Sequence, residues 1–113
     1  MIFDLVKVSD VMVENFSAGV LDRRGIGYPV VRKVRPDIIV MSASGAGQFG
    51  PQKHYAGLAT VFSAQSGLSH MTGYPDLPPT DVRDGIDLRV GTSTCFALMC
   101  ALAHRQRTGR GQF

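Results

Sequence analysis

The sequence predicts an α/β fold built on a parallel β-sheet. Two short apolar runs rich in β-branched residues, 11–13 and 38–41, have the composition of buried strands. Segments with helical composition separate and follow them, an alternation typical of parallel sheets covered by helices. Hydrophobic residues make up 44% and charged residues 19% of the 113-residue chain, which is ordinary for a globular domain.

The remaining elements are predicted from apolar spacing and from the positions of glycine and proline. Helical spacing of Ile2, Leu5 and Val6 indicates a helix at the start of the sequence. Short helices should end before the glycine pair that follows residue 24 and before Pro36. The expected elements are then helices at 20–24, 28–34 and 58–69, a loop at 44–56 and a turn-rich connection at 73–85.

The longest predicted element is a helix over residues 88–107. Its central nine residues, 95–103, are all apolar, and Gly109 is a natural C-terminal stop. Nine apolar residues are too few to span a bilayer, so we expect a core helix and no membrane partner. Cys95 and Cys100 lie about 140° apart around it and cannot bridge to each other, so we expect buried reduced thiols.

The charge pattern gives no indication of nucleic-acid binding. The net charge is +3, and the one local basic group, Arg105, Arg107 and Arg110, complements the dipole at a helix C-terminus. No nucleic-acid-binding signature accompanies it. A mild basic excess suits an anionic ligand equally well. The first residues lack the basic and apolar regions of a signal peptide, so we expect a cytoplasmic protein.

Two patterns that resemble cofactor sites do not hold up. Residues 45–50 match G-x-G-x-x-G, but no helix is expected after them, and the next acid, Asp76, lies 26 positions beyond Gly50. NAD binding is therefore not predicted. The histidines share no ligand spacing with each other or with Cys and acidic residues, so no metal site is expected; they are His54, His70 and His104.

Asp87, at the expected start of the last helix, is interpreted either as a structural residue, which caps the helix or is simply solvated, or as a functional one. Asp is a preferred N-cap residue, because its side chain accepts a bond from a free N–H of the first turn. A helix N-terminus also stabilises an anionic carboxylate, which could then act as a nucleophile. Composition does not choose between capping and catalysis.

Three ordered stretches carry a family resemblance. The first is residues 10–16 with 19–23, and the second runs from 36–40 to Gly50-Pro51. The third begins with Ser-Gly-Leu at 66–68, continues through Asp87 and Gly91, and ends with Arg-Thr-Gly-Arg-Gly-Gln at 107–112. In order and spacing they resemble the family III CoA-transferases, which include formyl-CoA transferase and carnitine CoA-transferase.

The resemblance implies a Rossmann-like large domain and, in the full-length enzyme, an interlocked homodimer. Residues 1–113 are then expected to be part of that large domain, without its N-terminal strands and without the C-terminal small domain. A piece of this kind lacks sheet neighbours and is expected to have low stability alone.

The resemblance also implies the chemistry. Asp87 would attack an acyl-CoA thioester to give a mixed anhydride and CoA thiolate, which returns to form an aspartyl-CoA thioester. An acceptor carboxylate then repeats these steps in reverse. Asn15, Phe16 and Arg23 would hold CoA, which is a substrate, and no permanent cofactor or metal is required.

Alternatives remain open at this point. Without the resemblance, Asn15 would satisfy a turn, Phe16 would be core and Arg23 a surface residue. Acyl-CoA racemases of the same superfamily carry an Ala-Gly-His-Asp run where residues 56–59 are Ala-Gly-Leu-Ala, so the racemase histidine is missing. An inactive remnant of a transferase and an unrelated small basic binding module are the other hypotheses.

Overall fold

The computed structural model describes residues 1–80 and 83–113, with only the backbone of residues 83 and 84. Strands β1 (Val11–Glu14) and β2 (Ile39–Ser42) pair in parallel, as the sequence predicts. Val11 lies opposite Ile39, and Glu14 lies opposite Ser42. Both strands therefore end at the same edge of the sheet.

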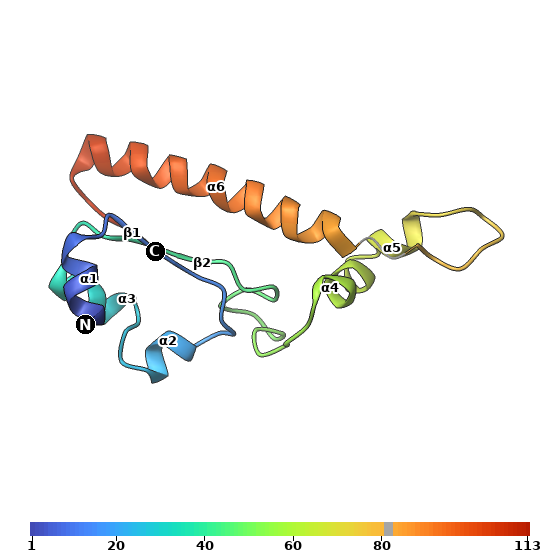
Figure 1. Ribbon diagram of the computed structural model, residues 1–113, viewed down its shortest axis with the longest axis horizontal. Helices are drawn as coiled ribbons and strands as arrows, with labels where there is room; N and C mark the ends of the chain where they lie inside the picture. Colours follow the sequence, from blue (N-terminus) through green and yellow to red (C-terminus); the bar gives the residue numbers. More distant parts are fainter. Residues whose placement is uncertain (81–82) are drawn as a thin grey trace.

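Helices cover both faces of this small sheet (Figure 1). Helices α1 (Ile2–Val8) and α3 (Tyr28–Val34) pack on one face, and α6 (Arg83–Thr108) runs along the other. The core lies beneath α1 and α3 and is made by the fully or nearly fully buried side chains Val6, Val31, Ile38 and Val40. The α/β prediction is confirmed.

Three short helices follow the strands in the chain: α2 (Val20–Arg23) after β1, and α4 (Ala59–Gln65) and α5 (Leu68–Met71) after β2. Of the last two, α5 lies farther from the sheet (Figure 1). The prediction of one helix over residues 58–69 is wrong. Gly67 separates α4 from α5 because its φ of +77° is left-handed, a conformation that a continuous right-handed helix excludes.

Helix α6 differs from its prediction in extent and in burial. It begins at Arg83 rather than at residue 88, so Gly85 and Asp87 lie inside it. Ala101 is buried against the sheet, but Phe96 is 73% exposed, and both cysteines are exposed rather than buried. The core-helix prediction is therefore wrong for the described residues, because only one face of α6 meets β2 and α4.

By length and composition, the part of α6 from Gly85 to Thr108 could cross a membrane. The nine-residue count missed this because Gly, Ser and Thr extend the weakly polar stretch toward the N-terminus.

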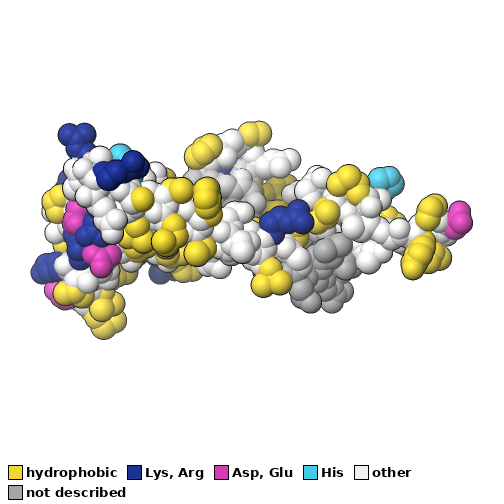
Figure 2. Space-filling model, turned by 90° about the horizontal axis from the view of Figure 1, so that it is seen from above, with side chains coloured by type: hydrophobic (Ala, Val, Ile, Leu, Met, Phe, Trp, Pro, Cys, Tyr) yellow, Lys and Arg dark blue, Asp and Glu magenta, His cyan; other side chains and the backbone are white. Residues whose placement is uncertain are grey.

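Hydrophobic side chains are spread along the face that carries α6 (Figure 2). In addition, the radius of gyration is 17.1 Å, against about 13 Å for a compact chain of this length. Much apolar surface is consequently open.

An ion-pair network joins α6 to the start of both strands. Arg105 donates to Asp37 through Nε at 2.8 Å and to Asp10 through Nη1 at 2.9 Å. Arg35, just after α3, donates to Asp10 at 2.8 Å and to Asp37 at 3.2 Å. Two carboxylates and two guanidinium groups thus hold the amino-terminal edge of the sheet.

After α6 the chain returns to the sheet. Gly109, with φ +70°, ends the helix, and the backbone N–H of Val40 donates to the Gln112 carbonyl at 3.0 Å. The N–H of Ile39 points the other way, to Asp10. Gln112 therefore bonds to the edge of β2 that faces away from β1, where a next strand is expected.

We predict that Asp37 makes the full-length protein sensitive to acid. Hydrogen bonding, from Arg105 first, lowers the pKa of the Asp37 carboxyl below its ordinary value. Stability from a depressed pKa is fully present above the unfolded value, about 3.9, and is lost as pH falls through the folded value. Urea unfolding at decreasing pH should show a smaller loss of stability in Asp37→Asn than in wild type. Asp4→Asn, at an exposed pair, should follow wild type, and an equal acid loss in Asp37→Asn would contradict the prediction.

Gly111 should not tolerate a side chain. A Cβ there would lie 2.0 Å from the Ile38 carbonyl oxygen, so the backbones would have to separate. We expect Gly111→Ala to lower the free energy of unfolding by about 1–3 kcal/mol. Gly91→Ala is the matched control, because a Cβ at that helical position meets nothing within 4 Å. Equal stability of both variants, measured by chemical denaturation, would disprove the close-packing argument.

Candidate active site

The polar residues of interest gather where the parallel strands end. Asn15 follows β1, and Ala43 follows β2. Open α/β sheets place ligands at this edge because loops diverge there and leave a crevice. The loop before α4 and the first turns of α6 complete the same region.

A cavity of about 460 Å³ lies at this edge and contains Asp87; we call it the Asp87 cavity. Four segments that are distant in sequence form it: the ends of both strands, the loop and start of α4, and α6. The lining residues are Asn15, Ala43, Gly45, Gly57, Leu58, Ala59, Phe62, Ile86, Asp87, Val90, Gly91 and Thr94. The structure thus brings Asp87 and Asn15, 72 positions apart, to one cavity.

Asp87 is not a helix cap, so that interpretation is wrong. It lies four residues after the first residue of α6, in the second turn, where helix-end effects have largely faded. The stabilisation of its carboxylate by the helix N-terminus, expected from the sequence, is therefore weak. Its side chain is exposed and accessible to a ligand in the cavity.

Two glycines let the cavity wall pack closely. A Cβ at Gly45 would lie 2.3 Å from the Phe62 ring, and one at Gly57 would lie 3.1 Å from Val61. The loop after β2 can therefore lie directly on α4. Apart from Asn15, Asp87 and Thr94, the lining consists of apolar residues and glycines.

The other predicted contacts divide between places. Phe16 is 52% exposed, so the interpretation of Phe16 as a core residue is wrong. It lines neither the Asp87 cavity nor the cavity that contains Arg23. Arg23 lies at the end of α2, and its Nη1 donates to the Ala18 carbonyl at 3.4 Å. Arg23 is therefore separate from Asp87 in the fold.

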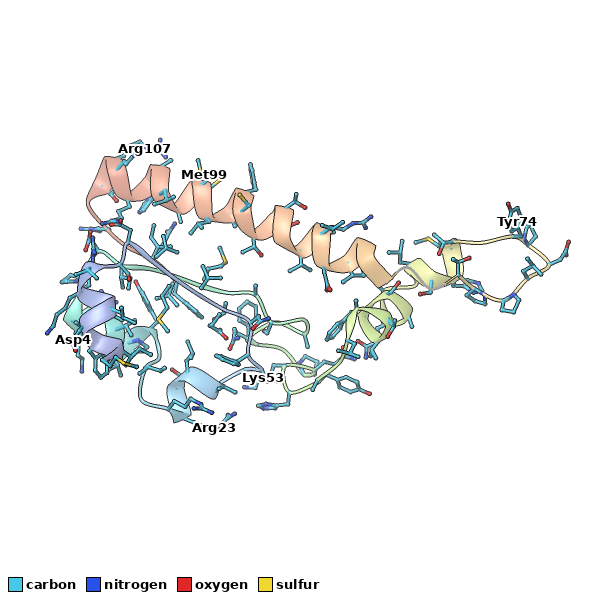
Figure 3. All side chains as sticks on the ribbon, in the orientation of Figure 1. Asp4, Arg23, Lys53, Tyr74, Met99 and Arg107 are labelled. Carbon is cyan, nitrogen blue, oxygen red and sulfur yellow. The ribbon has the colours of Figure 1, made fainter. Side chains whose placement is uncertain are left out.

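Arg23 lines a second cavity, of about 450 Å³, which we call the Arg23 cavity. Lys53 and His54 from the loop after β2 line it too, and Arg23 and Lys53 lie on the same side of the molecule (Figure 3). Lys53 was not predicted from the sequence. The signal in the sequence was the basic pair Lys53-His54, which follows Gly50-Pro51 after one glutamine and which only the fold places beside α2.

Glu14 is a second residue that was not predicted from the sequence. It ends β1 and is buried, and its carboxylate accepts a hydrogen bond from the Phe16 N–H at 2.6 Å. Ser42, opposite it on β2, also donates to this carboxylate. Glu14 directly follows the apolar run 11–13, and nothing in the sequence indicated that its carboxylate would be buried.

The two cofactor patterns considered from the sequence both lie in the described part of the chain. Among residues 1–80 and 83–113, no group of three His, Cys, Asp or Glu side chains is arranged to hold a metal ion. The Gly-rich segment 45–50 is a loop, and within the described residues that follow it the next helix begins at Ala59. No helix N-terminus therefore stands at its third glycine to receive a phosphate.

Comparison with known proteins gives a consistent family. The sequence matches CoA-transferase family III over residues 1–113. It is 42% identical over 110 residues to an acetyl-CoA:oxalate CoA-transferase of Acetobacter aceti, covering 96% of this chain and 28% of that protein. It is 43% identical over 113 residues to a succinyl-CoA:glutarate CoA-transferase of Mus musculus, covering 97% and 26%. The chain thus spans about a quarter of the length of these relatives.

Solved structures show the same arrangement of elements. A CAIB/BAIF family protein from Brucella suis superposes with a TM-score of 0.88 at 33% identity, over 98% of this chain and 30% of that one. A protein from M. tuberculosis superposes with a TM-score of 0.89 at 26% identity, over 98% and 32%.

Proposed function

Because the chain belongs to CoA-transferase family III, we propose that its residues form the nucleophile and part of the CoA site of an acyl-CoA:carboxylate CoA-transferase. The observation that carries the proposal is the Asp87 cavity. Among the described residues, its lining includes one carboxylate, that of Asp87, together with Asn15, at the edge of the sheet where α/β proteins bind ligands. The curated relatives above are CoA-transferases by name, which supports the same chemistry.

In the proposed reaction the Asp87 carboxylate attacks the thioester carbon of acyl-CoA. The C–S bond breaks, leaving a mixed anhydride on Asp87 and CoA as thiolate. The thiolate attacks the aspartyl carbonyl and releases the donor acid as carboxylate, which leaves an aspartyl-CoA thioester. The acceptor carboxylate reverses these steps to leave as acyl-CoA, and no metal or redox group takes part.

Asn15 and the Arg23 cavity supply the binding functions in this proposal. Asn15 lines the Asp87 cavity. In this proposal its amide donates to the oxygen that becomes negative during attack. Arg23 and Lys53 provide cationic donors for the phosphates of CoA. Phe16 lies between Asn15 and Arg23 in the sequence and is exposed, so its ring can pack against the pantetheine or adenine.

The exposed face of α6 is proposed to contact protein. The ion pairs of Arg105 tie the end of α6 to the sheet, and Asp87 and Arg89 interrupt the weakly polar stretch. Residues 1–113 would form part of a large domain, within a cytoplasmic homodimer that binds neither nucleic acid nor membrane.

The racemase alternative is opposed by Leu58. A racemase of this superfamily would have its proton-transferring histidine at this position, and here an apolar side chain lines the Asp87 cavity. An inactive remnant and a small basic binding module differ from the transferase in activity and in CoA binding. The two experiments below separate them.

Asp87→Asn in the full-length protein should abolish CoA transfer while folding and CoA binding persist, because the amide keeps the shape but is not a nucleophile. Hydroxylamine added during turnover with acyl-CoA should convert one Asp side chain to a hydroxamate, which peptide mass spectrometry would place at Asp87. Asp76→Asn, in the exposed loop before residue 81, is the matched control and should stay active. Asp81 and the side chain of Asp84, two other acids near the helix start, lie outside the described residues. Turnover by Asp87→Asn, or a hydroxamate elsewhere, would disprove the assignment.

Arg23→Ala should weaken CoA binding by about 1–3 kcal/mol, the range for a hydrogen bond to a charged group. The loss should shrink as salt is added, because phosphates are the proposed target. Titration calorimetry at low and high salt, with CoA and with dephospho-CoA as ligands, measures the loss of affinity and its dependence on salt. Arg32→Ala, at an exposed arginine of α3 that stacks on Tyr28, is the control for loss of one positive charge. Equal affinities of Arg23→Ala and wild type would exclude Arg23 from the site.

A further inference from the structure

Glu14 is a buried carboxylate that the transfer chemistry does not use. It is 9% exposed, and burial of a carboxylate is unfavourable unless donors surround it. Oε2 accepts from the Phe16 N–H, while Oε1 accepts from the Ser42 hydroxyl and, at 3.4 Å, from Gln48 Nε2. Three segments therefore meet at this side chain: the turn after β1, the end of β2 and the Gly-rich loop.

Gln48 extends the connection toward α2. Its Oε1 accepts from the Gly19 N–H at 3.4 Å, and its Nε2 also contacts Ser44 Oγ at 3.2 Å. Gly19 immediately precedes α2, which ends at Arg23. Gln48 itself lines the Arg23 cavity. Glu14 is thus one hydrogen bond away from Gln48 in the lining of the Arg23 cavity, and two hydrogen bonds away from Gly19 at the start of α2.

Hydrogen bonds of Glu14 hold the chain on both sides of Asn15. The Ala43 N–H donates to the Glu14 carbonyl at 2.8 Å, and the Phe16 N–H donates to the Glu14 side chain at 2.6 Å. The backbone before Asn15 is consequently fixed to the residue after β2, and the backbone after Asn15 is fixed to the Glu14 side chain. This fixes where Asn15 enters the Asp87 cavity.

We propose that Glu14 is a positioning residue that sets the two cavities relative to each other. It touches no substrate. It acts through the backbone of Phe16, which places Asn15 beside Asp87, and through Gln48 and Gly19, which place α2 and Arg23. This inference rests on the proposed function, since the groups that it positions are those proposed to bind CoA and the reacting carbonyl.

The hydrogen-bond pattern requires an acceptor at position 14. In Glu14→Gln, the new amide NH₂ faces donors on either side. Gln48 would have to turn to accept from it, and its own NH₂ would then face the Gly19 N–H. Adding Gln48→Glu restores an acceptor for both the amide at position 14 and Gly19. The double variant therefore reverses the donor and acceptor roles without changing the size of either side chain.

The test measures the dissociation constant for CoA, KM, kcat and the thermal midpoint in the full-length protein. Glu14→Gln and Gln48→Ala should each raise the CoA dissociation constant and KM about tenfold. The double variant Glu14→Gln/Gln48→Glu should return to within about threefold of wild type, as expected for coupled neighbours. Val31→Ala, a fully buried core residue outside both cavities, should lower the thermal midpoint and leave CoA affinity and KM unchanged.

Unchanged affinity in Gln48→Ala, or failure of the double variant to recover, would overturn the inference. The inference would also be overturned if Val31→Ala lost CoA affinity in proportion to its lower thermal midpoint, because affinity would then simply report stability. If Glu14→Gln does not fold, the CoA affinity of Gln48→Ala tests the inference, because Gln48 is only half-buried. Wild-type protein that binds CoA without transferring it would overturn the aspartyl mechanism and leave this affinity test valid. Wild-type protein that does neither would overturn both.

Discussion

The parallel pairing of β1 and β2 is the constraint on which the rest of the structure depends. Parallel strands end at the same edge, so Asn15 and the loop after Ser42 emerge side by side. Charged groups hold both ends of this short pair. At the amino-terminal edge Arg105 and Arg35 bind Asp37 and Asp10, and at the carboxyl edge Ser42 donates to Glu14. A shift by one residue would break both sets of contacts and turn the core side chains outward.

Glycines set how closely the loops approach this frame. Gly111 lies against the backbone of Asp37 and Ile38, and this lets the chain after α6 bond to the free edge of β2. Gly45 lies against the Phe62 ring and closes one wall of the Asp87 cavity. In both places the absence of a Cβ allows the close contact, which is with backbone atoms at Gly111 and with an aromatic ring at Gly45.

The buried apolar contacts are concentrated beneath α1 and α3. On the other side, α6 places Ala101 on the sheet while Phe96 and Met99 remain exposed, and Met99 projects away from the strands in Figure 3. Relatives that contain this fold are three to four times longer, by the share of their length that it covers. An open apolar face beside an ion-paired helix end is what a segment of a larger protein core would present.

The sequence by itself determined the local elements and the chemistry to expect. Strand composition, helical spacing and helix stops such as Gly109 act between near neighbours, so both strands, α1 to α3 and the end of α6 were predictable, and the ordered motifs indicated the family. Only the tertiary structure decided which residues meet. Asp87 and Asn15 share a cavity, Lys53 joins Arg23, and Glu14 is buried, because these contacts join segments far apart in sequence. The start of α6 and the exposure of Cys95 and Cys100 were predicted wrongly. A local pattern does not record which face of a helix meets the rest of the fold, and here only one face of α6 does.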